Sequence, residues 1–263
     1  MPSEPSEPSE PNESRESSGP SESGDSGETD APGGVGGDGV RERLLARWSA
    51  LLVRARDGAP GPDPRPYGEN LLDRWGEPHR RYHAVGHLHA VLDRVEELAP
   101  HAETGAGGAA PDIDAVLLAA WFHDAVYKPW HSENEERSAR LAERALPEAG
   151  VPSARTESVA RLVRLTVHHD PEPGDVEGEL LCDADLAVLA GSPDAYAAYA
   201  AGVRAEYDFV PDPDFRAGRA AVLRQLLGHE RMFRTAYAYG HWEAAARRNL
   251  RTELELLASG GPS

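Results

Sequence analysis

Residues 113–124, IDAVLLAAWFHD, form the stretch that decides the fold of this chain. Nine of the ten residues from Ile113 to Phe122 are apolar, so a helix formed here would be apolar on every side and should be buried. Ten residues are too few to cross a bilayer as a helix. The stretch therefore predicts a helix at the centre of a globular domain.

The central helix is expected to end in His123-Asp124, a pair that could bind a metal ion. An ionised carboxylate at the end of a buried helix costs free energy unless a cation or strong hydrogen bonds compensate it. A neighbouring histidine can offer a neutral ring nitrogen, so a divalent metal ion could provide that compensation. The alternative is a helix-terminal pair that simply faces the solvent.

The composition narrows the classes of partner and compartment. The formal net charge of the 263 residues is −18, which argues against a nucleic-acid backbone or an anionic membrane as partner. Residues 1–40 contain ten acidic residues and one arginine, so half of this charge lies there. A single cysteine, Cys182, excludes an intramolecular disulfide, and the N-terminus lacks a signal-peptide pattern. These features predict a cytoplasmic protein.

The chain divides into a tail and one domain. Residues 1–39 are rich in Ser, Glu, Pro and Gly and cannot bury enough apolar surface to order, so they predict a disordered acidic tail. Residues 40–259 alternate amphipathic stretches with Gly/Pro-rich breaks, without a convincing run of strand-like alternation. This pattern predicts a single all-α domain of six to nine helices. Predicted N-caps are Ser132 (with Glu135 in a capping box), Ser153, and Ser192 followed by Pro193.

Further ligands for a metal ion are predicted on either side of the central helix. His83 and His87 are four residues apart, so on a helix they would share one face. Asp183 and Asp185 are two apart, so only one can face inward comfortably. Asp185 has apolar neighbours one turn away in both directions and is predicted to be the buried one. A histidine, the His-Asp pair and an aspartate from three helices could then hold Mn, Fe, Co, Ni, Mg or Zn.

The ordered pattern H…HD…D resembles the HD superfamily of metal-dependent phosphohydrolases. The runs YHAVGH, WFHDAVY, NEERSA, LTVHH, CDADLAVL, VRAEY, AGR and ARRNLRTEL are similar to a bacterial family of predicted HD phosphohydrolases, over about residues 68–258. The resemblance implies an HD-domain helical bundle that cleaves a phosphate ester or nucleotide with a metal-activated water. The metal ligands that it implies are His87, His123, Asp124 and Asp185.

Two catalytic residues are further candidates. The spacing Y-H-x-x-x-H also resembles cyclic-nucleotide phosphodiesterases, which implies that His83 protonates the leaving group. The chain lacks the asparagine and the HDxxH continuation of those enzymes, so a cyclic nucleotide is not favoured as the substrate. Lys128, the chain's only lysine, follows the His-Asp pair and could meet a phosphate; the alternative is a solvated loop charge.

Other polar residues are candidates for a second metal ion or for the phosphate. His168 or His169 could ligate a second metal ion, and His169 better continues the apolar stripe of its helix; a packed histidine is the alternative. Arginines that match positions of the family could bind phosphate or form ordinary salt bridges: Arg204, Arg219 and Arg247.

Three classes of function remain open from the sequence. The first is a phosphohydrolase that acts on a phosphorylated small molecule, with neither nucleic acid nor membrane as partner. The second is a di-iron oxygenase, because the HD fold also supports that chemistry. The third is a metal-stabilised regulatory or binding module without turnover. The sequence does not discriminate among substrates or oligomeric states.

Overall fold

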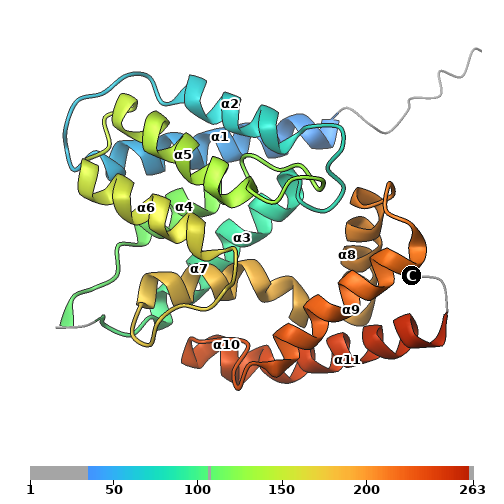
Figure 1. Ribbon diagram of the computed structural model, residues 1–263. Helices are drawn as coiled ribbons and strands as arrows, with labels where there is room; N and C mark the ends of the chain where they lie inside the picture. Colours follow the sequence, from blue (N-terminus) through green and yellow to red (C-terminus); the bar gives the residue numbers. More distant parts are fainter. Residues whose placement is uncertain (1–34, 106–107, 261–263) are drawn as a thin grey trace, which may run out of the picture.

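The computed structural model describes residues 35–105 and 108–260 (Figure 1). Within these residues the secondary structure consists of α-helices and short 3-10 segments, without a β-strand. The all-α prediction is therefore confirmed. The described residues form eleven α-helices, more than the six to nine expected, and one of them is a short C-terminal helix that the sequence pattern did not indicate.

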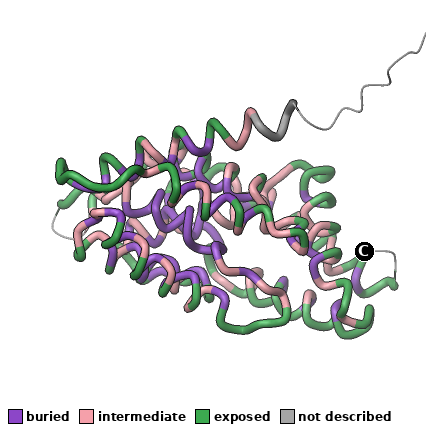
Figure 2. The backbone as a smooth tube through the Cα atoms, turned by 90° about the horizontal axis from the view of Figure 1, so that it is seen from above, coloured by how far each residue is buried: buried purple, intermediate pink, exposed green. Residues whose placement is uncertain are grey.

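Six helices form a bundle around the central one. Helix α4 (Ile113–Phe122) contacts α1, α3, α6 and α7, and its residues from Ala115 to Phe122 are all buried. Figure 2 shows this buried centre in purple. The prediction of a buried central helix over these ten residues is confirmed. The other six helices of the bundle are α1 (Val35–Ala55), α2 (Arg65–Trp75), α3 (Val85–Leu98), α5 (Asn134–Glu148), α6 (Ser153–Leu165) and α7 (Val176–Leu186).

The remaining helices gather beside α7, drawn from orange to red in Figure 1. Helix α11 packs against η3 and α9, and the Asn249 side chain donates hydrogen bonds to the carbonyls of Leu189 and Gly191 at 2.9 Å. These contacts join the end of the chain to the segment that follows α7. The elements are η3 (Ala187–Ala190), α8 (Pro193–Glu206), α9 (Asp212–Gly228), α10 (Ala236–His241) and α11 (Glu243–Ser259).

Helix starts agree only partly with the predicted caps. The Ser192 side chain accepts a hydrogen bond from the Ala195 amide, with Pro193 in the first turn, as predicted. The other two serine caps are wrong, because α5 and α6 begin without a side-chain cap. The Asn134 side chain instead ties the preceding loop together, since it accepts from the Lys128 amide and donates to the Lys128 carbonyl.

The boundary with the predicted tail also differs. Helix α1 begins at Val35, five residues before the expected start of order at Val40. The remainder of the tail prediction, residues 1–34, lies outside the described residues. No helix in the described part of the chain has both the length and the apolar composition to cross a membrane.

Candidate metal centre

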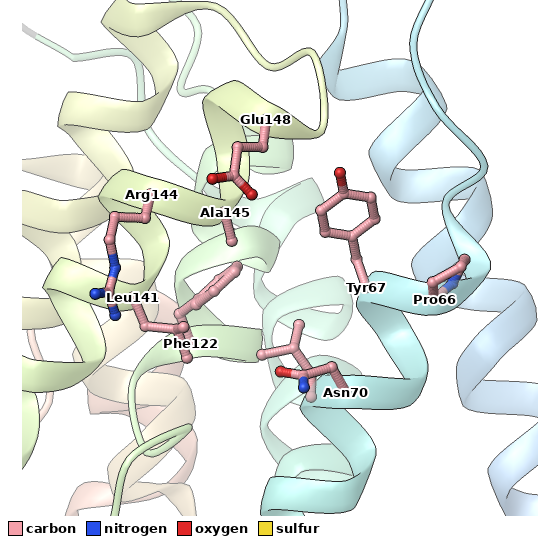
Figure 3. Close-up of a pocket in the computed structure, with 9 residues that line it drawn as sticks. Pro66, Tyr67, Asn70, Phe122, Leu141, Arg144, Ala145 and Glu148 are labelled. Atoms are coloured by element: carbon pink, nitrogen blue, oxygen red, sulfur yellow. The ribbon is translucent and has the colours of Figure 1, made fainter.

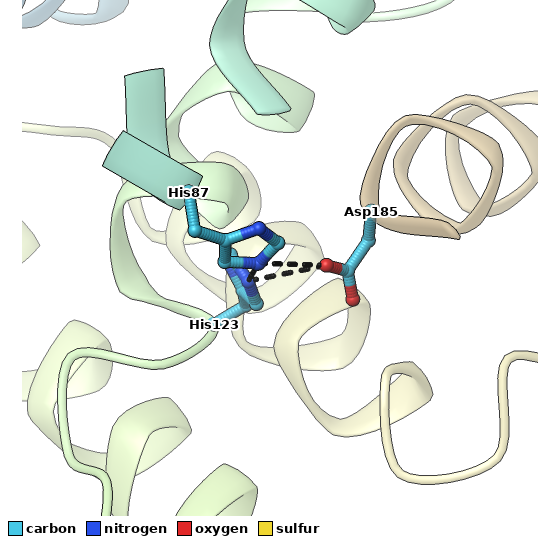
Figure 4. A group of neighbouring side chains, drawn as sticks. All are labelled: His87, His123 and Asp185. Atoms are coloured by element: carbon cyan, nitrogen blue, oxygen red, sulfur yellow. Dashed lines mark hydrogen bonds and ion pairs between the residues drawn. The ribbon is translucent and has the colours of Figure 1, made fainter. Parts of the chain in front are cut away.

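Three helices bring two imidazoles and one carboxylate together in the interior (Figure 4). His87 lies in the first turn of α3, His123 directly follows α4, and Asp185 lies in the last turn of α7. The Nε2 atoms of the two histidines are 3.3 Å apart, and Asp185 Oδ1 lies 3.0 Å from His87 Nε2 and 3.6 Å from His123 Nε2. These donor atoms all lie within 4.8 Å of one another, so one cation could contact all three.

Local structure directs the ring of His123 toward this cluster. His123 Nδ1 lies 2.8 Å from the carbonyl oxygen of Ala120, one turn back in α4. A proton held on Nδ1 by this carbonyl leaves Nε2 with its lone pair, which is the form that binds metals. The indole of Trp75 packs against the rings of both histidines, with centroids 5.4 Å from His123 and 6.1 Å from His87. Orientation and packing therefore prepare the ring for ligation.

Asp124 borders the cluster on the side of His123. Its Oδ2 atom lies 3.4 Å from His123 Nε2, and its side chain is largely buried. The backbone carbonyl of Asp124 accepts a hydrogen bond from the buried guanidinium of Arg80 at 2.8 Å. Asp124 is not one of the three residues whose donor atoms are mutually close, so the structure places this predicted ligand at the edge of the site.

The second carboxylate oxygen of Asp185 faces a further histidine. Asp185 Oδ2 lies 2.7 Å from His169 Nε2, whereas His168 is exposed. His169 has a φ of 51°, in the left-handed region that non-glycine residues seldom adopt. Of the two neighbouring histidines, His169 is thus the one that reaches the site, as predicted, although it lies beyond the end of α6 at Leu165 and so does not continue the helical stripe on which the prediction was based.

The electrostatics of the cluster favour positive charge between its members. Burial disfavours the charged form of Asp185, but the adjacent His123, His169 and His87 outweigh this and hold its pKa well below the usual range. Burial likewise opposes charge on His123, yet the carboxylates of Asp124 and Asp185 raise its pKa to about 9. A site that stabilises a proton this strongly also favours a divalent cation, and two imidazole nitrogens and a carboxylate oxygen suit one.

His83 precedes α3 and does not belong to it, so the expectation that His83 and His87 share a helical face is wrong. The helix starts only at Val85, after a turn that brings the two rings to a centroid separation of 5.7 Å. His83 Nδ1 lies 2.6 Å from Glu206 Oε2. The other oxygen of Glu206 accepts hydrogen bonds from three successive amides, those of Arg81, Tyr82 and His83.

The hydrogen bond between His83 and Glu206 favours the charged form of both side chains, against the effect of burial. Burial disfavours ionised Glu206, but His83 and the backbone amides outweigh it and hold the pKa of Glu206 at about 2. Burial also disfavours protonated His83, whereas the hydrogen bond to Glu206 raises the pKa of His83 above its ordinary value. The Tyr127 hydroxyl donates to the same Glu206 oxygen at 2.9 Å. Sequence reasoning missed Glu206, although it lies in the quoted run VRAEY; its ordinary helix-end position carried no signal of burial.

Asp183 is as buried as the core and Asp185 is only partly buried, so the prediction that Asp185 is the buried one of the two aspartates is wrong. Its carboxylate accepts hydrogen bonds from the Arg234 amide, the Thr235 amide and the Thr235 hydroxyl at 2.7–2.8 Å. Burial raises the pKa of Asp183 to about 6 despite these hydrogen bonds. The outward face of α7 is covered because the segment leading into α10 packs on it, which the local pattern could not indicate.

Lys128 is not among the residues of the cluster, and it lines another cavity together with Val126 and Tyr127, between α2 and α5.

The three candidate phosphate-binding arginines are engaged in contacts of the C-terminal helices. Arg204 bonds the Tyr207 carbonyl. Arg219 forms an ion pair with Glu253, and Arg247 forms one with Glu243.

A cavity of about 450 Å³ opens beside the cluster and is lined by both His87 and Asp185. Much of its wall consists of alanines and glycines, with the rings of Tyr82 and Tyr199 on one side. The Tyr82 hydroxyl is buried and has no hydrogen-bond partner among the described residues. A small molecule could therefore reach the donor atoms, and one polar group is available to meet it.

Comparison of the chain with protein-family models, with curated protein sequences and with solved structures returned no match. The functional inference therefore depends on the chemistry of the site. That chemistry comprises an interior His-His-Asp cluster, a second acidic residue, Asp124, beside it, and a hydrogen-bonded histidine-glutamate pair next to it.

Proposed function

We propose that this protein is an HD-type metal-dependent phosphohydrolase that cleaves a phosphorylated small molecule. The observation that carries the proposal is the convergence of His87, His123 and Asp185 from three separate helices, with donor atoms within 4.8 Å of one another. Asp124 would complete the ligand set from the edge of the site. Buried ionisable groups from distant parts of a chain rarely gather without a ligand to hold, because their desolvation is costly.

The donor set fits a divalent cation that keeps coordination positions open. Two imidazole nitrogens with one or two carboxylate oxygens form a mixed set that suits Mn, Fe, Co, Ni or Zn, and less well Mg. Such a cation, when bound, supplies a nucleophilic water near neutral pH and positive charge against the phosphoryl oxygens. His123 Nε2 and His87 Nε2 face Asp185 already, so little rearrangement of the chain is needed for binding.

His83 is placed to move a proton in the same reaction. Glu206 engages its Nδ1 at 2.6 Å and favours the protonated ring, so Nε2 can carry a proton for the departing oxygen of the substrate. The three amide hydrogen bonds to Glu206 hold this carboxylate in one position. His83 therefore acts in our proposal as the general acid, and Glu206 as its positioning residue.

A site for two metal ions is a second candidate, and one contact favours it. Asp185 presents Oδ1 to His87 and Oδ2 to His169, an arrangement in which one carboxylate could bridge two cations. A dinuclear centre is compatible with phosphate hydrolysis and also with di-iron oxygen chemistry. The number and identity of the bound metal ions separate these alternatives.

The test combines metal analysis with a substrate screen on the purified full-length protein. We expect about one divalent ion per chain in the wild type, hydrolysis of at least one member of a panel of phosphate esters and nucleotides, and loss of both in His123→Ala. His101→Ala is the matched control, because His101 is an exposed histidine stacked on Tyr237, outside the cluster.

Other outcomes would indicate a different function or refute the ligand assignment. Two irons per chain with oxygen consumption would indicate an oxygenase. Stoichiometric metal without hydrolysis of any panel member would indicate a binding module. Full metal occupancy in His123→Ala would refute the ligand assignment itself.

A further inference from the structure

A groove with two chemically different halves runs between α2 and α5, outside the cavity that His87 and Asp185 line. Two adjoining cavities, of about 370 and 460 Å³, share Leu141 and Arg144 in their linings. Figure 3 shows the first of them, with Tyr67 and Asn70 from α2 facing Arg144 and Glu148 from α5.

The groove follows from the helical period of its two walls. On α2 its lining positions are 66, 67, 70, 71 and 74, and on α5 they are 137, 140, 141, 144, 145 and 148. Residues three, four and seven apart lie on one face of a helix, so each wall is a single continuous face. Phe122, the last residue of α4, forms the floor between the two walls.

The half of the groove nearer Lys128 concentrates positive charge. Three side chains at this end, those of Lys128, Arg137 and Arg144, have no ion-pair or hydrogen-bond partner in the described part of the chain. Arg140 and Arg144 are four residues apart on α5, a spacing at which like charges repel. The excess stands out in a chain of net charge −18. The cations of this end are Arg74, Lys128, Arg137, Arg140 and Arg144.

The charge at this end is only partly balanced from within. Arg140 pairs with Glu136 at 2.8 Å, and Arg74 donates to the Asn70 side chain at 3.0 Å. Glu77 is the one carboxylate that lines the basic cavity, and it is engaged by the buried Arg80. An anion with several charges would offset the repulsion that remains, and guanidinium groups bind phosphate oxygens well.

The other half of the groove is apolar with a few polar groups. The half-buried Tyr67 ring stands opposite Ala145, with Phe122 below it, and Leu71 also lines this half. The Asn70 amide oxygen is occupied by Arg74, so its NH₂ group is left to donate, and the Glu148 carboxylate can accept. An aromatic wall with one donor and one acceptor suits a planar heterocycle with polar edges.

We propose that the α2–α5 groove binds a nucleoside polyphosphate, with the base against Tyr67 and the phosphates among Arg137, Arg140, Arg144 and Lys128. The two cavities fall in the size range of small-molecule sites. They share no lining residue with the cavity that His87 and Asp185 line. The groove is therefore a second, separate site, and it does not depend on the proposed hydrolytic activity.

The test is calorimetric titration of the full-length protein with the β,γ-imido analogue of ATP, which resists hydrolysis. We expect saturable binding that weakens about tenfold or more in Arg137→Glu/Arg144→Glu, because each change removes a charge-assisted hydrogen bond and adds repulsion. The control is Arg224→Glu, an exposed arginine on α9 with the same change in charge per substituted residue, which should bind as the wild type does. Melting curves of each variant verify that the domain remains folded.

Two further sets of titrations test where the analogue binds and whether its base contributes to the affinity. The variant His87→Ala/Asp185→Ala should bind the analogue unchanged, whatever happens to the metal ion. Tyr67→Ala should weaken the analogue but leave the affinity for inorganic triphosphate unaltered. The proposal is overturned by absence of binding to the wild type, by loss of binding in His87→Ala/Asp185→Ala, by an equal loss in Arg224→Glu, or by triphosphate binding as tightly as the analogue.

Discussion

At the scale of single residues, α7 carries two carboxylates, one fully and one partly buried, that contact different parts of the molecule. Asp185 faces the histidines of the metal centre, and Asp183 accepts three hydrogen bonds from Arg234 and Thr235. Residues that are two positions apart in a helix point in directions about 200° apart, so the two carboxylates contact different neighbours. One helix thereby anchors both the candidate centre and the C-terminal elements.

The two aspartates should respond differently to substitution. We expect Asp185→Ala to lose the metal ion, whereas Asp183→Ala should keep it but unfold more easily, by about 1–3 kcal/mol, because buried amides lose their acceptor. Urea denaturation and elemental analysis measure the two effects. Asp208→Ala, at an exposed aspartate, should change neither. Loss of metal in a folded Asp183→Ala protein would show that the two carboxylates are not independent.

The pair of His83 and Glu206 predicts a dependence on the leaving group. His83→Ala should lower kcat on alkyl phosphates by roughly a hundredfold to ten-thousandfold, as expected for a lost proton donor. The loss should shrink for nitrophenyl esters, whose oxygen hardly needs a proton. His89→Ala is the control, because His89 in the wild type pairs with Asp93 on the surface of α3. Equal losses on both substrate types would instead assign His83 a structural role.

At the scale of elements, the contact between α1 and α2 depends on a glycine. A Cβ atom on Gly68 would lie 2.5 Å from Cδ1 of Trp48. Trp48 cannot yield, because its indole is buried against Trp121 and donates a hydrogen bond to the Pro64 carbonyl at 2.8 Å. The absence of a side chain at position 68 thus sets how closely the two helices approach.

Gly68→Ala should therefore destabilise the fold although alanine favours helices. We expect a loss of about 1–3 kcal/mol from overpacking, measured as a lower melting temperature. Gly218→Ala is the matched control on α9, where a Cβ would meet nothing within 4 Å. That variant should be neutral or more stable by up to about 1 kcal/mol, from helix propensity alone. An unchanged melting temperature in Gly68→Ala would show that α2 can shift away from Trp48.

At the scale of the whole molecule, the candidate metal centre couples helices that are distant in the chain. Its donors come from α3, the end of α4, and α7, so a bound cation would cross-link the bundle from inside. Ligands that bind only the folded state stabilise it, by about 2.7 kcal/mol at a hundredfold excess over the dissociation constant. Metal binding and folding should therefore be linked in this protein.

Removal of the metal should lower the melting temperature of the whole domain. We expect a chelator to reduce it in the wild type and added divalent cation to restore it. The variant His87→Ala/Asp185→Ala should melt at one temperature with or without chelator, as followed by circular dichroism. A chelator effect of equal size in that variant would mean that the stabilising cation binds elsewhere.

The features that the sequence by itself determined are local ones. The apolar composition of Ile113–Phe122 determined a buried central helix, and that helix has the predicted bounds. Periodicity likewise indicated an all-α fold. Each of these follows from residues within one or two helical turns, and such interactions act before distant elements meet.

Only the tertiary structure determined which polar side chains are buried and which residues they contact. Asp183 is buried because a segment about fifty residues later covers it, and Glu206 becomes the partner of His83 across 123 positions of the chain. Lys128 lies in the basic half of the α2–α5 groove because two helix faces flank the loop that carries it. None of these pairings has a local signature, since hydrogen bonds and charge compensation depend on which surfaces the folded chain brings together.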